Sequence, residues 1–491
     1  MSVCSLAREA LDRIHPVRIT GRVSGIRGLS VLVDDLPLPV GALVRIAHSE
    51  HRTTHDAVEP AHERHERRVN VEPHEVWGEV VGASRDQSIV MLLGSPSGLR
   101  AGDLVSGYAT APSVRVGPGL LGRVVNALME PLDGKGPIVG GEPRSLHAEP
   151  IPALRRAPVR EPLLTGVRAI DLITPIGRGQ RLGVFAGPGV GKSTLLGTIA
   201  RRTSADVNVI ALIGERGREV GDFIEKSLGE EGMARSVVVV ATGDEQATMR
   251  LRASRAACSI AEWFRDRGLD VLLMMDSVTR FAHAQRQLGL AAGEPPSAKG
   301  YTPSVFAQLG QLLERAGAVK PAGPAAKGAS AGGSITGLYT ILVEGDDMTE
   351  PIADAARGIL DGHLVLSRRL AQENHYPAID VMDSISRLAE DVSDRAQTNA
   401  RRQLLRLMAL HAEVEDIIRI GAYARGVDPE TDIAVDMHPA IVALLRQSRD
   451  EHEPIVKSHA TLLKLANEAA EKLGRAQRSR GVNPVGTSSA K

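Results

Sequence analysis

The sequence predicts an α/β protein with a parallel sheet at its centre, an antiparallel β-barrel before it and a helical region after it. Short β-rich runs separated by Gly and Pro fill residues 17–110. Continuous apolar runs, each followed by a helix-like segment, begin near residue 180. Such runs are typical of strands that are buried on both faces of a parallel sheet. After about residue 427 the apolar residues take helical spacing.

Five segments are expected along the chain. In the first, apolar residues from Val3 to Ile14 recur at helical spacing and stop before Pro16, which predicts a short amphipathic helix. We expect this helix to pack either on its own domain or on a partner. The expected segments are this helix at 1–16, the β-barrel at 17–110, the α/β core at 111–426, a helical domain at 427–475 and a disordered tail at 476–491.

Two stretches interrupt these patterns. An insertion in the barrel region, residues 48–74, is rich in His, Glu and Arg. A metal site there is conceivable, but the insertion has no Cys and no compact ligand pair, so a solvated loop is the preferred interpretation. Residues 318–332 are rich in Ala, Gly, Pro and Lys without periodicity, and we expect a mobile loop.

The composition narrows the classes of function. The 59 Lys and Arg residues balance 59 Asp and Glu residues, so the basic excess that is typical of nucleic-acid-binding proteins is missing. The cysteines, Cys4 and Cys258, stand far apart, which does not support a disulfide framework and suits a reducing cytosol. No apolar run reaches the roughly 18 residues of a membrane span. The first residues lack the apolar core of a secretory signal, so we expect a cytoplasmic protein.

A glycine-rich loop connects the apolar run at 182–185 to a helix-like segment that starts at Leu195. This order is typical of a phosphate-binding P-loop, in which backbone N–H groups and a helix N-terminus surround an anion. The pattern GxxxxGK[ST] is broken only at its first position, where Ala186 stands. Lys192 can reach the β- and γ-phosphates of a nucleotide, and Ser193 can ligate Mg²⁺. The loop residues expected to contact the nucleotide are Gly187, Pro188, Gly189, Val190, Gly191, Lys192, Ser193 and Thr194.

Two carboxylates follow other apolar runs. Asp276 ends the run at 271–275, and Glu215 follows the run at 209–213 after one glycine. Because ligands gather at the carboxyl ends of parallel strands, both side chains should lie near the phosphates. Asp276 is suited to hold Mg²⁺, and Glu215 to orient the attacking water. The alternative for Glu215 is an ion pair with a neighbouring Arg such as Arg216.

Further motifs follow in a characteristic order. They are GERGREV at 214–220, LLMMDSVTRFA at 272–282, GEPP at 293–296, LVEGDD at 342–347 and HYPAIDVMDSISR at 375–387. Together with the P-loop they resemble the type III secretion ATPases, relatives of the catalytic subunit of rotary ATP synthases. The resemblance extends from about residue 17 to about residue 475 and implies a RecA-like core. MRLRA at 249–253 and KGY at 299–301 favour the flagellar export branch over the virulence injectisome branch.

The resemblance also implies roles for single residues. Tyr376 stands where the family has the aromatic that stacks on adenine, and a core Tyr is the alternative. The other implied matches are Lys192 and Ser193 with the phosphate and magnesium contacts, Glu215 with the catalytic glutamate, Arg216 with a contact to the γ-phosphate, and Asp276 with the magnesium carboxylate.

Arg387 matches the arginine finger of the family, which acts on the nucleotide of an adjacent subunit. A guanidinium supplied across an interface neutralises charge on the transferring phosphoryl group and raises the rate by about 10³–10⁵. The resemblance therefore implies that a ring, a homo-hexamer in this family, is the active form. Without the resemblance, Arg387 would be taken for an ordinary surface arginine.

The function implied by the resemblance is Mg²⁺-dependent hydrolysis of ATP to ADP and phosphate, coupled to flagellar protein export. Hydrolysis would release chaperones from export substrates and deliver unfolded proteins to an export gate in the membrane. A stator-like regulator would bind the N-terminal helix, and a central stalk would meet the C-terminal helices. The protein would be cytoplasmic and peripheral at the inner face of the membrane.

Three alternatives stay open. The first is an ATPase of a virulence injectisome. The second is a non-catalytic nucleotide-binding subunit, which usually lacks the water-orienting carboxylate that Glu215 supplies. The third is an RNA translocase of the Rho type, but residues 17–110 contain only Trp77 and Tyr108 as aromatics, so a stacking platform for single strands is missing and no nucleic-acid partner is expected.

Overall fold

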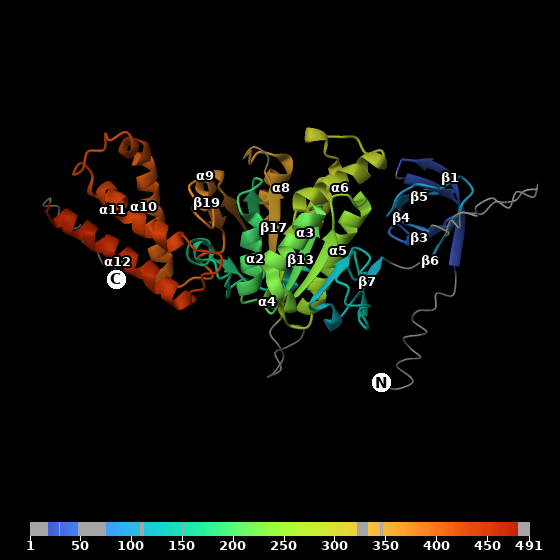
Figure 1. Ribbon diagram of the computed structural model, residues 1–491, viewed down its shortest axis with the longest axis horizontal. Helices are drawn as coiled ribbons and strands as arrows, with labels where there is room; N and C mark the ends of the chain where they lie inside the picture. Colours follow the sequence, from blue (N-terminus) through green and yellow to red (C-terminus); the bar gives the residue numbers. More distant parts are fainter. Residues whose placement is uncertain are drawn as a thin grey trace, which may run out of the picture.

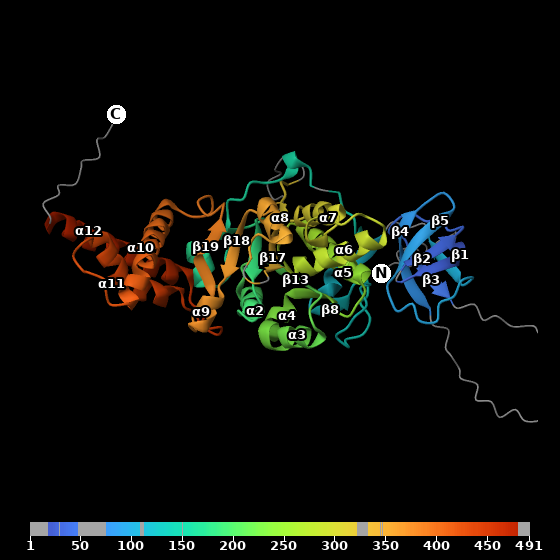
Figure 2. The ribbon, with the colours of Figure 1, turned by 90° about the horizontal axis from the view of Figure 1, so that it is seen from above.

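A computed structural model of the chain describes residues 18–28, 30–47, 75–108, 112–149, 151–321, 332–343, 345 and 347–479. The expected helix at 1–16, the His-rich insertion at 48–74, residues 322–331 of the expected loop and residues 480–491 of the expected tail lie outside these ranges. The described parts lie in a row (Figure 1 and Figure 2). A β-barrel forms one end, an α/β core the middle and a helical unit the other end.

The barrel is closed and antiparallel, with the strand order β1-β2-β5-β4-β3-β6. Its interior is filled by alternate residues of each strand, such as Val31 and Val33, which are fully buried. The last strand pairs with both β1 and β3 and thereby closes the barrel. The sequence analysis did not name this strand, because LVSGY carries little apolar alternation. The strands are β1 (Arg18–Arg27), β2 (Ser30–Asp34), β3 (Leu43–Ala47), β4 (Val76–Ala83), β5 (Gln87–Leu92) and β6 (Leu104–Tyr108).

The core is built on a sheet with the order β19-β18-β12-β17-β15-β13-β14-β8, to which β16 adds beside β17. The strands from β18 to β8 are parallel, whereas β19 runs antiparallel to β18 at the edge. The predicted parallel sheet therefore has a reversed edge strand, β19, and the short β16 also runs antiparallel to β17. Its strands are β8 (Arg123–Asn126), β12 (Arg181–Ala186), β13 (Val207–Ile213), β14 (Ser236–Ala241), β15 (Asp270–Asp276), β16 (Gly317–Ala318), β17 (Ser334–Leu342), β18 (Gly362–Leu366) and β19 (Ile379–Ser386).

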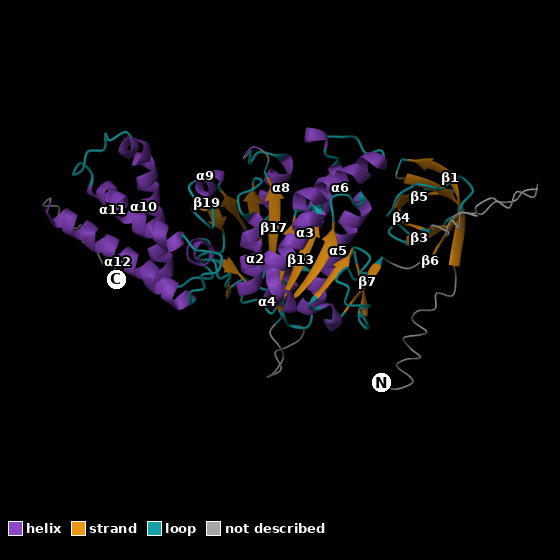
Figure 3. Cartoon of the chain, viewed as in Figure 1, coloured by secondary structure: helices purple, strands orange, loops and turns teal. Residues whose placement is uncertain are grey.

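Helices cover both faces of this sheet (Figure 3). Successive residues of β13 belong to different cores: Val209 and Ala211 pack with the α5 side, and Ile210 and Leu212 pack with the α2 side. This two-sided burial explains why the strands read as continuous apolar runs. The helices of the core are α2 (Lys192–Arg202), α3 (Gly217–Asp222), α4 (Gly229–Ala234), α5 (Ala247–Arg265), α6 (Val278–Ala291), α7 (Pro303–Leu313), α8 (Pro351–Ile359) and α9 (Arg368–Gln372).

Short elements complete the core. Two small antiparallel pairs, β7 (Ser113–Val116) with β9 (Glu142–Ser145) and β10 (Pro162–Leu163) with β11 (Ile176–Gly177), lie outside the main sheet. The single turns are η1 (Pro118–Leu120), η2 (Ala153–Arg155), η3 (Ala169–Ile173), η4 (Phe223–Leu228) and η5 (Ala298–Gly300).

The helical unit consists of α10 (Arg395–Arg419), α11 (Pro429–Leu445) and α12 (Ile455–Ser479). It begins at Arg395, earlier than the residue 427 set in the sequence analysis. The first helix starts at a capping box formed by Asp394 and Gln397, and its many charged residues hide the apolar stripe that includes Leu404 and Leu407. In the described part of the chain, the helices are too short or too polar to cross a bilayer.

Candidate active site

The P-loop lies between the end of β12 and the start of α2. Gly189 and Gly191 have φ angles of 78° and 92°, a region that L side chains rarely adopt, so the turn requires glycine at both positions. Ala186 is the last residue of β12 and is 1% exposed. It precedes the turn and packs in the sheet, which explains why Ala is tolerated at the first motif position. Ser193 and Thr194 are exposed on the first turn of α2.

Lys192, Glu215 and Asp276 meet beside this loop. Nζ of Lys192 lies 3.4 Å from Oε1 of Glu215 and also donates a hydrogen bond to Oδ1 of Asp276. The three residues follow or end β12, β13 and β15, which are parallel and share one carboxyl edge. Thr340 on β17 donates a second hydrogen bond, of 2.7 Å, to Oδ1 of Asp276. One cation and two carboxylates are thus held together at the place where the sequence predicted them.

The charged groups of this cluster shift one another's pKa values. Burial opposes the charge of Lys192, but Asp276 and Glu215 outweigh burial, and the pKa of Lys192 lies above its usual value. Burial raises the pKa of Glu215 to about 7; Lys192 opposes this rise and Asp276 adds to it. Lys192 therefore keeps its charge near neutral pH, while Glu215 is poised between its two protonation states. A carboxylate with such a pKa is suited to accept a proton from water.

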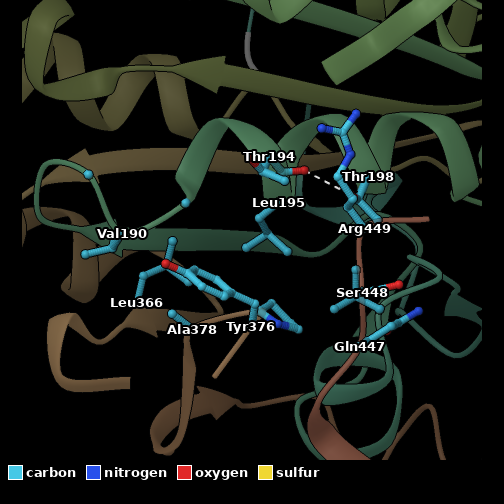
Figure 4. Close-up of a pocket in the computed structure, with 14 residues that line it drawn as sticks. Val190, Thr194, Leu195, Thr198, Leu366, Tyr376, Ala378, Gln447, Ser448 and Arg449 are labelled. Atoms are coloured by element: carbon cyan, nitrogen blue, oxygen red, sulfur yellow. Dashed lines mark hydrogen bonds between the residues drawn. The ribbon is translucent and has the colours of Figure 1, made fainter. Parts of the chain in front are cut away.

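A cavity of about 440 Å³ adjoins the P-loop (Figure 4). Tyr376 crosses it toward Val190, and a Cβ atom on Gly191 would lie 3.6 Å from the Tyr376 ring. The walls are mostly apolar, as is usual for pockets that bind small molecules. The lining residues are Val167, Gly189, Val190, Gly191, Thr194, Leu195, Thr198, Leu366, Tyr376, Pro377, Ala378, Gln447, Ser448 and Arg449.

One wall of this pocket comes from the connection between α11 and α12. The backbone N–H of Gln447 donates to the carbonyl of Tyr376 at 2.9 Å. Its side chain accepts from the N–H of Arg168 at 2.9 Å and donates to the carbonyls of Gly166 and Glu451. The sequence analysis missed this wall, because no local pattern links residue 447 to residue 168.

Arg216 and Arg387 are not brought to this cluster. The side chain of Arg216 is 86% exposed and lies 3.3 Å from Glu219. Arg387 is exposed just beyond the end of β19, at the edge of the sheet. Its guanidinium donates to the carbonyl of Arg357 at 3.4 Å. The residue before Arg387 pairs with Gly362 at the start of β18, so Arg387 lies at the amino edge of the parallel strands, whereas the P-loop lies at their carboxyl edge.

Arg280 is a further residue that the sequence analysis did not single out. It lies on the first turn of α6, four positions after Asp276, and its stem packs against Gly214, the residue before Glu215. A Cβ atom on Gly214 would come within 2.8 Å of Cβ of Arg280. The helical spacing after Asp276 was the available signal, since the first turn of a helix that follows a strand stays at the same sheet edge.

The parallel sheet, the P-loop and the clustered lysine and carboxylates define a nucleotide-hydrolysing enzyme with a RecA-like core. Residues 166–386 match the nucleotide-binding domain of the ATP synthase alpha/beta family, and residues 393–464 match the T3SS EscN ATPase C-terminal domain. The flagellum-specific ATP synthase of Bacillus subtilis (strain 168) is 49% identical over 390 residues, or 79% of this chain and 86% of that protein. The type 3 secretion system ATPase of Xanthomonas euvesicatoria is 50% identical over 373 residues, or 76% of this chain and 82% of that protein.

A solved structure agrees with these matches. It is the assembled ATPase EscN in complex with its central stalk EscO, from the type III secretion system of enteropathogenic E. coli. The TM-score is 0.77 at 39% identity, and the match covers 91% of this chain and 100% of that chain. The chain belongs to the type III secretion ATPases, the family that includes the flagellum-specific members. It is accordingly an ATP-hydrolysing enzyme of flagellar or type III protein export, as the sequence analysis predicted.

Proposed function

We propose that ATP is cleaved at the P-loop by Lys192, Glu215 and Asp276. The observation that carries this proposal is the meeting of one lysine and two carboxylates at the carboxyl edge of the parallel sheet. Without nucleotide, the two carboxylates balance the lysine. An entering triphosphate forms an ion pair with the Lys192 ammonium in place of Glu215, and Glu215 can then bind the attacking water.

Glu215 acts as the water-orienting base in this proposal. The water oxygen attacks the γ-phosphorus, and the bond from that phosphorus to the bridging oxygen of ADP breaks. The proton of the water passes to Glu215 and then to the released phosphate. The raised pKa of Glu215, about 7, supports this role, because proton transfer is most efficient when the pKa of the base is near the working pH.

A magnesium ion fits the oxygen donors beside the loop. Ser193 offers a hydroxyl and Asp276 a carboxylate, and Mg²⁺ prefers oxygen ligands of this kind. The hydrogen bonds from Lys192 and Thr340 both reach Oδ1 of Asp276 and fix the carboxylate, and neither of them uses Oδ2. When bound, the ion would neutralise charge on the β- and γ-phosphates.

The base of the nucleotide is proposed to stack on Tyr376. Tyr376 is 43% exposed and lines the mostly apolar pocket beside the P-loop. An exposed aromatic in a chain with 2% aromatic residues is better explained by a stacking partner than by core packing. The phosphates would lie against the backbone of residues 187–191 and the side chains of Lys192, Ser193 and Thr194.

The arginine finger is proposed to come from a neighbouring chain. Arg387 is exposed at a sheet edge, away from its own P-loop, as a residue that serves another subunit would be. The related EscN is an assembled ATPase, which supports a ring, and a homo-hexamer is our proposal. Arg216, exposed beside Glu215, would approach the γ-phosphate only after a movement of its loop.

The hydrolysis is proposed to serve flagellar protein export, because MRLRA at 249–253 and KGY at 299–301 favour that branch. Injectisome secretion is the alternative, since relatives of both kinds are similar at nearly equal identity. Export chaperones and an export gate would be the partners, with a stator-like regulator at the N-terminal segment. A central stalk at the helical unit is supported by the complex of EscN with EscO. The protein would work in the cytoplasm, peripheral to the membrane.

A structure with a non-hydrolysable ATP analogue and Mg²⁺ tests this proposal directly. We expect the γ-phosphate beside Lys192, Glu215 oriented toward the γ-phosphorus, and the adenine on Tyr376. Density for the analogue elsewhere, or Glu215 turned away from the γ-phosphate, would overturn the proposed mechanism.

A further inference from the structure

A second cavity, of about 340 Å³, lies at the same carboxyl edge of the sheet. It is bounded by α6, η5 and the chain that follows β17. Four basic side chains line it: Arg280, His283 and Arg286 along one face of α6, and Lys299 on η5. The proposed hydrolysis assigns no role to this basic cavity.

The acidic residues in its wall are already engaged. Oε1 of Glu350 accepts a hydrogen bond from the Tyr301 hydroxyl at 3.0 Å, and Oε2 accepts two backbone N–H groups at the start of α8. Oδ1 of Asp347 accepts from Thr349, and Oδ2 lies 3.6 Å from Nζ of Lys299. These carboxylates therefore balance Lys299 and hold local structure.

The guanidinium groups of Arg280 and Arg286, which also line the cavity, are not balanced by a nearby carboxylate among the described residues. Among the described residues, no carboxylate lies within 4.0 Å of Arg280 or Arg286. Arg286 lies over the ring of Tyr301, with its guanidinium carbon 5.3 Å from the ring centre. A half-buried guanidinium that stacks on an aromatic ring is oriented, and its N–H groups remain able to bind an oxyanion. The cavity thus presents oriented positive charge.

Arg280 connects this cavity to the proposed catalytic cluster. It lines the cavity, and its stem packs against Gly214, directly before Glu215. Arg280 is also close in the chain to Asp276, the last residue of β15, because α6 begins two residues after it. In the proposed hydrolysis the γ-phosphate is cleaved beside Glu215, so the released phosphate is the anion formed nearest to Arg280.

We propose that this cavity binds inorganic phosphate, as a site that holds the product after cleavage and before release. The inference rests on the proposed function, because it takes its ligand from ATP hydrolysis. Arg280 would receive the phosphate beside Glu215, and Arg286 and Lys299 would bind it from other walls of the cavity through charge-assisted hydrogen bonds. The volume of about 340 Å³ and the basic side chains around it favour a single oxyanion over an acidic peptide, which needs a longer groove.

The test measures binding of radiolabelled inorganic phosphate while the P-loop is filled. The full-length protein is saturated with a non-hydrolysable ATP analogue and Mg²⁺, so that the γ-phosphate position is occupied. Equilibrium dialysis should then find one phosphate per chain. Arg286→Gln and Lys299→Gln should each weaken phosphate binding about tenfold, the loss expected for a charge-assisted hydrogen bond. Arg402→Gln, which removes an exposed guanidinium of α10, is the matched control and should leave phosphate affinity within twofold.

The outcomes separate this inference from the proposed function. Failure of the analogue to bind the wild-type protein would contradict the proposed function. Normal binding of the analogue with no bound phosphate would overturn the inference alone, and so would phosphate binding that both cavity variants retain. Binding of an acidic peptide in competition with a weaker phosphate signal would assign the cavity to a peptide and overturn the phosphate proposal. Because Lys299 is exposed, Lys299→Gln keeps the test valid if Arg286→Gln does not fold.

Discussion

Oε1 of Glu215 lies 3.4 Å from Nζ of Lys192, and the same ammonium group binds Asp276. The lysine that is proposed to hold phosphate is therefore already paired with the carboxylate that is proposed to hold water. A triphosphate must compete for Lys192 when it enters, and that competition releases Glu215. This relationship leads to specific expectations for variants of the cluster.

Replacing Glu215 by Gln should lower kcat by about 10²–10⁴-fold, because the amide cannot accept the proton of the attacking water. Binding of ATP should change by less than about threefold or become tighter, since the amide no longer competes for Lys192. Phosphate release and binding of a fluorescent ATP analogue measure the two effects. Glu225→Gln, an exposed carboxylate on η4, is the control. Turnover at the wild-type rate in Glu215→Gln would show that another residue positions the water.

The pH dependence of kcat/KM should report the raised pKa of Glu215. Below pH 7 this carboxyl is increasingly protonated and cannot act as a base, so kcat/KM should rise with pH and level off above about 7. Lys192 stays charged over this range, because its pKa is raised. Steady-state rates from pH 5.5 to pH 9 give the midpoint. A midpoint near the ordinary glutamate value of 4.5 would contradict the assignment.

The raised pKa of Glu215 also predicts how the folding stability depends on pH. Between the unfolded value of 4.5 and the folded value of about 7, the folded chain binds more protons at Glu215 than the unfolded chain. The contribution of Glu215 to stability is therefore present at low pH and is lost as pH rises through this window. Glu215→Gln has no carboxyl group that loses a proton in this window. The difference in melting temperature, variant minus wild type, should therefore increase from pH 5 to pH 8. A constant difference across this window would contradict the predicted linkage.

If Arg387 acts on a neighbouring chain, Arg387→Ala should reduce the rate of assembled rings by about 10³-fold or more, without a change in melting temperature. Mixing tests the neighbour directly. Rings that combine Arg387→Ala chains with Glu215→Gln chains should regain activity, because some sites then receive Glu215 from one chain and Arg387 from another. The absence of regained activity, with mixed rings confirmed by mass spectrometry, would contradict action in trans. Arg369→Ala on α9 is the exposed control.

Tyr376→Ala should raise the KM for ATP about five- to tenfold by removing the stacking surface, while kcat changes little. Tyr376→Phe keeps the ring and should retain the wild-type KM. Steady-state kinetics distinguish these variants. Equal loss in both would mean that the hydroxyl, and not the ring, contributes to nucleotide binding.

The proposed catalytic cluster could be predicted because its signals are local. Lys192 follows a glycine turn, and Glu215 and Asp276 each stand at the end of a buried strand. Parallel strands then bring these ends together without any further information. A position near the end of a strand was not enough to place Arg216. Its chain neighbour Glu215 is in the cluster, but the side chain of Arg216 is 86% exposed.

What was missed depends on contacts between distant segments. Gln447 reaches Arg168 across 279 positions of the chain, and no periodicity encodes that pairing. The reversed direction of β19 follows from its short connection to β18 through α9, which apolar content does not reveal. The helix α10 was missed for a different reason, since a helix with charges around most of its surface has a weak apolar signal.

The wall that Gln447 contributes to the proposed base pocket has a consequence for the three C-terminal helices. The connection between α11 and α12 forms one wall of this pocket and is hydrogen-bonded to Tyr376 and to the segment around Arg168. We therefore expect a ligand in the pocket to change the tilt of the three C-terminal helices. The coupling is reciprocal, so a change of tilt should also change the affinity of the pocket for its ligand. If ATP binds in this pocket as proposed, a partner protein that moves α12 away from the core should lower the affinity for ATP, and bound ATP should lower the affinity for that partner by the same factor.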